Sequence, residues 1–96
     1  MSKRFDIGKL VATAGVHELM TNDLSFRNFV NASFMRYIMG DWGDTCEEDK
    51  KLNDSSVENG ERILAVYKME GHPGNTIWII TEWDRSCTTI LFPNEY

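Results

Sequence analysis

Three segments in the second half of the chain favour β-strands because they are rich in β-branched and aromatic residues: 62–69, 76–83 and 88–92. Their connections, residues 70–75 and 84–86, are too short to hold the crossover helix that links parallel neighbours. We therefore expect the three strands to pair as an antiparallel meander, which limits the fold to one built around such a sheet.

The start of the chain predicts one more strand and a short helix. Apolar and polar residues alternate over residues 5–13, a strand pattern with a break at Gly8. Residues 14–20 have the apolar spacing of a two-turn helix. The strand can join the meander as a fourth member.

Residues 25–38 predict the main helix of the fold. Their apolar side chains recur every three or four positions, at Phe26, Phe29, Val30, Phe34, Tyr37 and Ile38. Asp23 or Ser25 can cap its first amides, and Gly40 can supply the left-handed residue that ends it.

The length of 96 residues allows one domain, residues 1–96, because two independent cores would each be too small. We expect an α+β fold whose four-stranded antiparallel sheet combines the C-terminal meander with the N-terminal strand. The main helix packs across one face, with short helices beside it. Both faces of residues 62–69 are apolar, so we expect Trp42 and its loop to cover part of the other face.

The charge of the chain is concentrated in residues 41–61. This segment holds eight acids and two lysines, a formal charge of −6, and leaves seven acids and eight bases elsewhere, or +1. A total charge of −5 disfavours direct binding to nucleic acid. No apolar run has the length of a signal peptide or membrane span, so we expect a soluble cytoplasmic protein without membrane contact.

Within the acidic segment we expect a short helix over residues 46–53. Thr45 and Glu48 have the spacing of a capping box, and acids in the first turn suit the helix dipole. A weaker turn after Asp54 ends at residues 59–60. Trp42, between two glycines, is expected to anchor the loop that precedes the helix.

Two polar clusters, residues 40–49 and 81–86, hold the candidate binding residues. These are Asp41, Trp42, Asp44, Glu47, Glu48, Asp49, Glu82, Asp84 and Arg85. A guanidinium binds carboxylates through two parallel hydrogen bonds. We therefore expect Arg85 to form a structural ion pair with Asp41, Asp44 or Glu48.

Known catalytic motifs are missing from the sequence. The acids do not follow the order of a calcium loop, and His17 and His72 have no Cys or Ser nearby. Cys46 and Cys87 are predicted to be free thiols. We expect no catalytic residue, metal or cofactor; the alternative is a metal-assisted hydrolase that uses Asp41, Asp44, Glu48 and Asp84.

Three motifs span most of the chain: GKLVATAG at 8–15, GDWGD at 40–44 followed by Glu48, Asp49 and Asn53, and ITEWDRS at 80–86 running into TILFPNEY at 89–96. With them the chain resembles a family of short uncharacterised bacterial proteins of plasmids and integrative elements, some named for restriction systems. Relatives often carry proline at Ala14 and histidine at Tyr37, so no role of that histidine transfers here.

The resemblance implies an accessory protein of a mobile genetic element that acts against host defence. Together with the charge pattern, it leads us to expect a non-enzymatic protein that binds another protein through its acidic segment. The expected partner has a basic surface, such as the nucleic-acid groove of a CRISPR or restriction nuclease. The sequence leaves the oligomeric state open.

Overall fold

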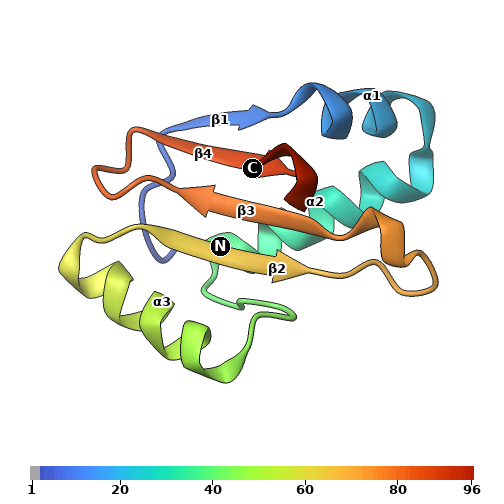
Figure 1. Ribbon diagram of the computed structural model, residues 1–96. Coiled ribbons are helices and arrows are strands. Elements are labelled where there is room, and N and C mark those ends of the chain that lie inside the picture. The colour runs from blue at the N-terminus through green and yellow to red at the C-terminus, as the bar shows by residue number, and fades with distance from the viewer. Residues whose placement is uncertain (1–2) are drawn as a thin grey trace.

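The computed structural model describes residues 3–96, which form an α+β fold (Figure 1). Its elements, in chain order, are β1 (Lys9–Ala12), α1 (Ala14–Asn22), α2 (Leu24–Ile38), α3 (Glu47–Asn59), β2 (Ile63–Tyr67), β3 (Ile77–Thr81) and β4 (Cys87–Leu91). There are also two 3₁₀ turns: η1 (Pro73–Asn75) precedes β3, and η2 (Pro93–Glu95) follows β4. Over this range no helix combines the length and the apolar composition needed to cross a bilayer.

The four strands form one sheet in the order β1-β4-β3-β2. The predicted meander is confirmed, because β2 pairs with β3 and β3 with β4, both antiparallel. The expected antiparallel pairing of the first strand is wrong: β1 runs parallel to β4. Short connections fix the direction of consecutive strands only, and three helices separate β1 from the rest of the sheet.

The first strand is shorter than the nine residues expected, because the chain turns at Gly8. The φ angle of Gly8 is 62°, and a Cβ atom there would collide with the carbonyl groups of Arg85 and Ser86. The break predicted at Gly8 therefore marks the start of β1, and the preceding Phe5 turns into the core.

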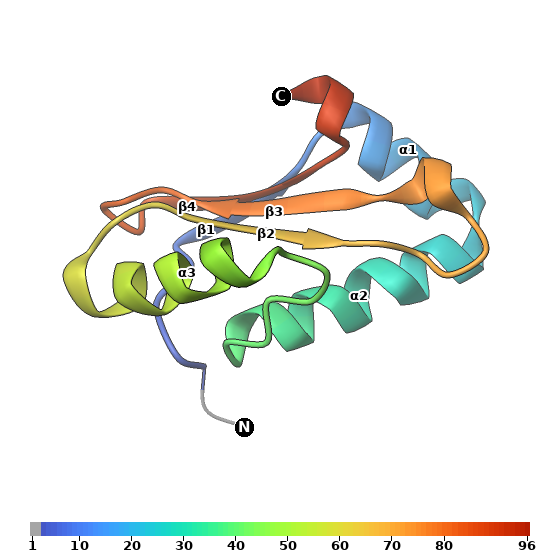
Figure 2. The ribbon, with the colours of Figure 1, turned by 60° about the horizontal axis from the view of Figure 1, so that its bottom comes forward.

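Helices α2 and α3 lie on the same side of the sheet (Figure 2). The core between α2 and the sheet is built around large buried side chains, including Phe26, Val30, Tyr37, Ile63, Tyr67, Ile77 and Ile79. Trp42 belongs to this core: its ring centroid lies 5.6 Å from that of Tyr37 and 5.9 Å from that of Phe5. The prediction that Trp42 covers the other face is therefore wrong.

The other face of the sheet is covered in part by the C-terminal residue. The Tyr96 ring packs edge-on against Trp78 at 5.6 Å, and Arg62 donates a hydrogen bond to the Tyr96 hydroxyl at 2.6 Å. Ile80 and Leu91 on this face are almost fully buried. Figure 2 shows the C-terminal turn on the side of the sheet opposite α2 and α3.

A chain of buried hydroxyl groups crosses the core. The Tyr37 hydroxyl lies 2.7 Å from the Thr81 hydroxyl, which lies 2.7 Å from that of Thr88, and Thr88 donates to the Ile7 carbonyl at 2.8 Å. Burial raises the pKa of Tyr37 above its ordinary value, so this side chain stays neutral. This row of hydrogen bonds links α2, β3, β4 and the N-terminal segment to one another.

Helix α2 begins and ends as the sequence predicts. The Asp23 carboxylate accepts from the Phe26 amide, and Gly40 has a φ of 84° just after the helix.

Helix α3 differs from its prediction, because it runs unbroken to Asn59 and stops at Gly60. The expected capping box is wrong, since the Thr45 hydroxyl donates to the Trp42 carbonyl and Cys46 occupies the cap position. Packing of the buried Asn53 and Ser56 against the sheet compensates for the low helix propensity of residues 53–56.

The C-terminal Glu95 caps helix α1 from 80 residues away. Its carboxylate accepts hydrogen bonds from the Thr13 hydroxyl at 2.6 Å, the Phe92 amide at 3.0 Å and the Gly15 amide at 3.1 Å. These bonds, the Thr13 bond above all, lower the pKa of Glu95. The contact ties the last turn of the chain to the end of β1.

We predict that Glu95→Gln lowers the melting temperature at pH 7 and that the difference from the parent closes as the solution becomes acidic. A carboxylate whose pKa is lowered by folding stabilises the fold above its unfolded pKa and loses this effect as pH falls through the folded value. Circular dichroism melts between pH 3 and pH 8 measure the difference. Glu18→Gln, at an exposed position on α1, is the control; an undiminished difference at pH 3 would contradict the prediction.

Candidate functional site

Asp41 and Asp54 of the 41–61 segment bind cationic or indole donors within the fold. Asp41 pairs with Arg36 at 2.9 Å and also accepts from the Gly43 amide. Asp54 accepts from the indole nitrogen of Trp42 at 2.9 Å and from Arg4 at 2.8 Å. These donors, Arg36 for Asp41 and the indole for Asp54, lower the pKa values of both carboxyl groups.

The loop before α3 covers the free edge of β2. The Asp44 amide donates to the Val66 carbonyl and its carboxylate accepts from the Lys68 amide, both at 2.8 Å. The Thr45 hydroxyl accepts from the Val66 amide. The Asn53 side chain pairs with both the amide and the carbonyl of Leu64. This part of the acidic segment therefore satisfies backbone groups that an edge strand would otherwise expose.

Gly43 allows the loop to approach β2 this closely. Its φ angle is 62°, and a Cβ atom would lie 2.5 Å from the Tyr67 ring and 2.8 Å from the Val66 carbonyl oxygen. The Tyr67 hydroxyl in turn donates to the Asp41 carbonyl at 2.6 Å. The GDWGD motif is thus accounted for by packing and backbone pairing.

Arg85 binds backbone carbonyl groups of three chain segments. Its guanidinium donates to Ser56 at 2.8 Å, Glu61 at 2.7 Å, Glu82 at 3.1 Å and Trp83 at 3.3 Å. Its own φ of 60° is unusual for a residue with a side chain. Arg85 therefore joins the last turn of α3 to the β3–β4 turn.

The predicted ion pair of Arg85 with an acid of the 40–49 cluster is wrong. Asp41 is bound to Arg36, and Asp44 to the Lys68 amide. Carbonyl groups at a helix C-terminus carry partial negative charge and attract a cation as carboxylates do. The sequence prediction ended the helix at residue 53, so it did not bring this helix terminus within reach of Arg85.

The β3–β4 turn presents a large aromatic side chain to solvent. Trp83 is 66% exposed, although Trp is usually buried for most of its surface. Next to it, the Asp84 carboxylate accepts from the Ser86 amide at 3.0 Å, and hydrogen bonding to Ser86 lowers the Asp84 pKa. Glu82 is half-buried. Trp83 was not among the predicted site residues, and its exposure depends on the tertiary fold.

Four of the five remaining acids lie on α3, and we call the surface that they form the acidic face of α3: Glu47, Glu48, Asp49 and Glu58. Their side chains are exposed, and within residues 3–96 only Glu47 has an ion-pair partner, Lys50 at 3.5 Å. Leu52 is 60% exposed. It borders a hollow of about 290 Å³, which is lined by Asp49, Leu52, Asn53, Arg62 and Leu64.

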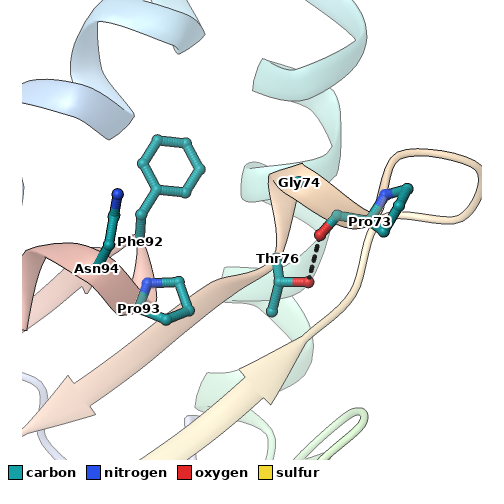
Figure 3. A pocket seen from close by; sticks show the side chains of 6 residues that line it. All are labelled: Pro73, Gly74, Thr76, Phe92, Pro93 and Asn94. Carbon is teal, nitrogen blue, oxygen red and sulfur yellow. Dashed lines mark hydrogen bonds between the residues drawn. The ribbon is translucent and has the colours of Figure 1, made fainter.

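A second hollow, of about 300 Å³, lies between η1 and η2 (Figure 3). Its lining residues are Pro73, Gly74, Thr76, Phe92, Pro93 and Asn94. The Thr76 hydroxyl is directed to the Pro73 carbonyl, as Figure 3 shows, and no lining side chain titrates near neutral pH. This hollow lacks the acid–base pair or activated nucleophile that catalysis needs.

The four carboxylates of the hydrolase alternative do not meet. Asp41 and Asp44 have separate partners, Glu48 lies on α3, and Asp84 lies in the β3–β4 turn. Among the described residues, no three His, Cys, Asp or Glu side chains are close enough to hold a metal ion. The carboxylates named in this alternative are therefore dispersed over the described part of the fold.

The nine predicted binding residues separate into two groups. Four of them hold the fold, namely Asp41, Trp42, Asp44 and Arg85; the other five are exposed on α3 or lie in the β3–β4 turn, namely Glu47, Glu48, Asp49, Glu82 and Asp84. No protein-family model, curated protein or solved structure matches the chain.

We predict that Arg85→Ala lowers the free energy of unfolding by about 2–3 kcal/mol, because partly buried carbonyl groups lose a charged donor. Arg85→Lys should recover less than half of this loss, since an ammonium group cannot bridge the same set of acceptors. Arg85→Gly should be less damaging than Arg85→Ala by about 0.5–1 kcal/mol, because glycine accepts a positive φ. Urea unfolding measures all three variants. Equal stability of Arg85→Ala and the parent would contradict the stabilising role of the bonds from Arg85 to the carbonyl groups.

Proposed function

We propose that the protein is a non-enzymatic binding module whose acidic face of α3 docks on a basic surface of another protein. The observation that carries the proposal is Leu52, a 60% exposed apolar side chain on a helix that also carries four exposed acids. Burying Leu52 in an interface would remove apolar surface from water, while the acids at the rim select a basic partner.

The acidic face of α3 is held rigidly, which favours docking. Asn53 pairs with the edge of β2 near the middle of the helix, and Arg85 binds the carbonyl of Ser56 in its last turn. A helix of 13 residues is about 20 Å long, enough to span one interface. Since the free protein already holds this helix, little conformational entropy is lost on binding.

The partner that we propose is a nuclease of a host defence system, CRISPR or restriction. Its nucleic-acid groove is basic, and the resemblance to plasmid and integrative-element proteins supports an accessory role against such a defence. The acidic face would occupy the groove in place of phosphate groups and exclude the nucleic acid. This role places the protein in the cytoplasm and requires no cofactor.

We predict that Glu48→Lys with Asp49→Lys, and separately Leu52→Ser, weaken partner binding at least tenfold. All three positions are exposed, so Leu52→Ser should change the melting temperature little. The two lysines replace first-turn acids that interact favourably with the helix dipole, so this variant should melt a few degrees lower and must be compared at a temperature where it is folded. The tagged parent identifies the partner by capture, and calorimetry with the purified partner measures affinity. Glu70→Lys, at an exposed position away from α3, is the matched charge control. Binding that survives both changes on α3 would contradict the proposed surface.

We predict that Mg²⁺, Mn²⁺ or Ca²⁺ at millimolar concentration shifts the melting temperature by less than about 2 °C, because a cation that binds weakly stabilises little. Asp44→Ala should lower the melting temperature equally with and without the ions, since it removes the bond to the Lys68 amide. A stabilisation of many degrees that Asp44→Ala abolishes would instead support the metal-assisted hydrolase.

A further inference from the structure

The two edges of the sheet are treated differently by the fold. The β2 edge is covered by Asp44, Thr45 and Asn53, as described above. In Figure 1 no ribbon runs alongside the outer edge of β1. All four residues of β1 are exposed, with Leu10 at 46% and Val11 at 39%. An apolar strand with a free edge is a template for pairing with another strand.

The backbone of β1 offers hydrogen bonds on this outer side. Lys9 donates to Ser86 at 3.1 Å and Thr13 donates to Ile90 at 3.0 Å, so odd-numbered residues direct their amides toward β4. Amides alternate in direction along a strand. The amide and carbonyl groups of Leu10 and Ala12 therefore point away from the sheet.

We propose that two copies of this chain join through β1, antiparallel about a two-fold axis at Val11, to form one continuous eight-stranded sheet. In this register Leu10 lies opposite Ala12 of the second copy, and each such pair exchanges two hydrogen bonds. Val11 lies opposite Val11 of the second copy. Both exposed apolar side chains of β1 then gain neighbours across the interface.

Charge complementarity identifies the occupant of the edge as a second copy. The same register places Lys9 opposite Thr13 of the second copy, and the Thr13 hydroxyl is bonded to the Glu95 carboxylate at 2.6 Å. Lys9 has no ion-pair partner among residues 3–96. Two-fold symmetry brings each Lys9 near the other copy's Glu95, whereas an axis at Leu10 would place Lys9 opposite Val11.

The dimer is independent of the proposed function. Strand β2, with α3 beside it, forms the edge of the sheet opposite β1. Pairing through β1 thus leaves the acidic face of α3 free in both copies, and a failure of either proposal leaves the other standing.

Disulfide cross-linking tests the register. In a variant with Cys46→Ser and Cys87→Ala, adding Val11→Cys should give a covalent dimer under mild oxidation. Residues opposite each other at such a non-hydrogen-bonded position have Cα atoms about 4.5 Å apart, within the span of a disulfide. Lys9→Cys is the matched control on the same face, because its two copies would be about 14 Å apart.

Light scattering during gel filtration of the parent should give the mass of a dimer. Leu10→Pro removes an outward amide while sparing the ladder to β4, so it should yield a folded monomer by circular dichroism. Lys9→Glu should weaken the dimer at least tenfold at low salt. A parent that stays monomeric at all concentrations would overturn the proposal. The β1 edge would then be free to pair with a strand of a different protein. Equal cross-linking of Val11→Cys and Lys9→Cys, or a dimer that Leu10→Pro leaves intact, would also overturn it.

Discussion

The guanidinium of Arg85 holds together helix α3, the connection between α3 and β2, and the β3–β4 turn. Its Ser56 acceptor also accepts from the amides of Gly60 and Glu61, so the guanidinium adds a charged donor where the end of α3 meets the β3–β4 turn. The angle of α3 against the sheet therefore depends on a residue outside the helix. The orientation of the acidic face of α3 and the exposure of Trp83 follow from the same contacts.

Acids of similar chemistry have two different uses in this fold. Asp41, Asp44 and Asp54 accept hydrogen bonds that fix the loop, the β2 edge and the Trp42 ring. The acids of the acidic face of α3 are instead exposed to solvent. A charge count alone assigns all of them to one surface, whereas their hydrogen bonds separate the structural acids from those available for binding.

The two edges of the sheet likewise differ: the β2 edge is covered, and the β1 edge is exposed. Side chains that carry both donors and acceptors, such as Asn53, satisfy the β2 edge without adding a strand. At the opposite edge, Glu95 fixes the junction between β1 and α1 and leaves the outer backbone of β1 free. The two proposed contacts, a different protein at α3 and a second copy at β1, therefore use opposite edges of the sheet.

Local signals in the sequence were enough to predict the meander and the helix over residues 25–38, and they narrowed its cap to Asp23 or Ser25, because short connections, apolar periodicity and capping act between neighbours in the chain. It also singled out Glu47, Glu48 and Asp49 as candidate binding residues, which stays a prediction. The parallel direction of β1, the carbonyl partners of Arg85 and the exposure of Trp83 became visible only in the folded structure. These features depend on contacts between segments far apart in the chain. The partner of a side chain in such a contact is set by how the segments pack together.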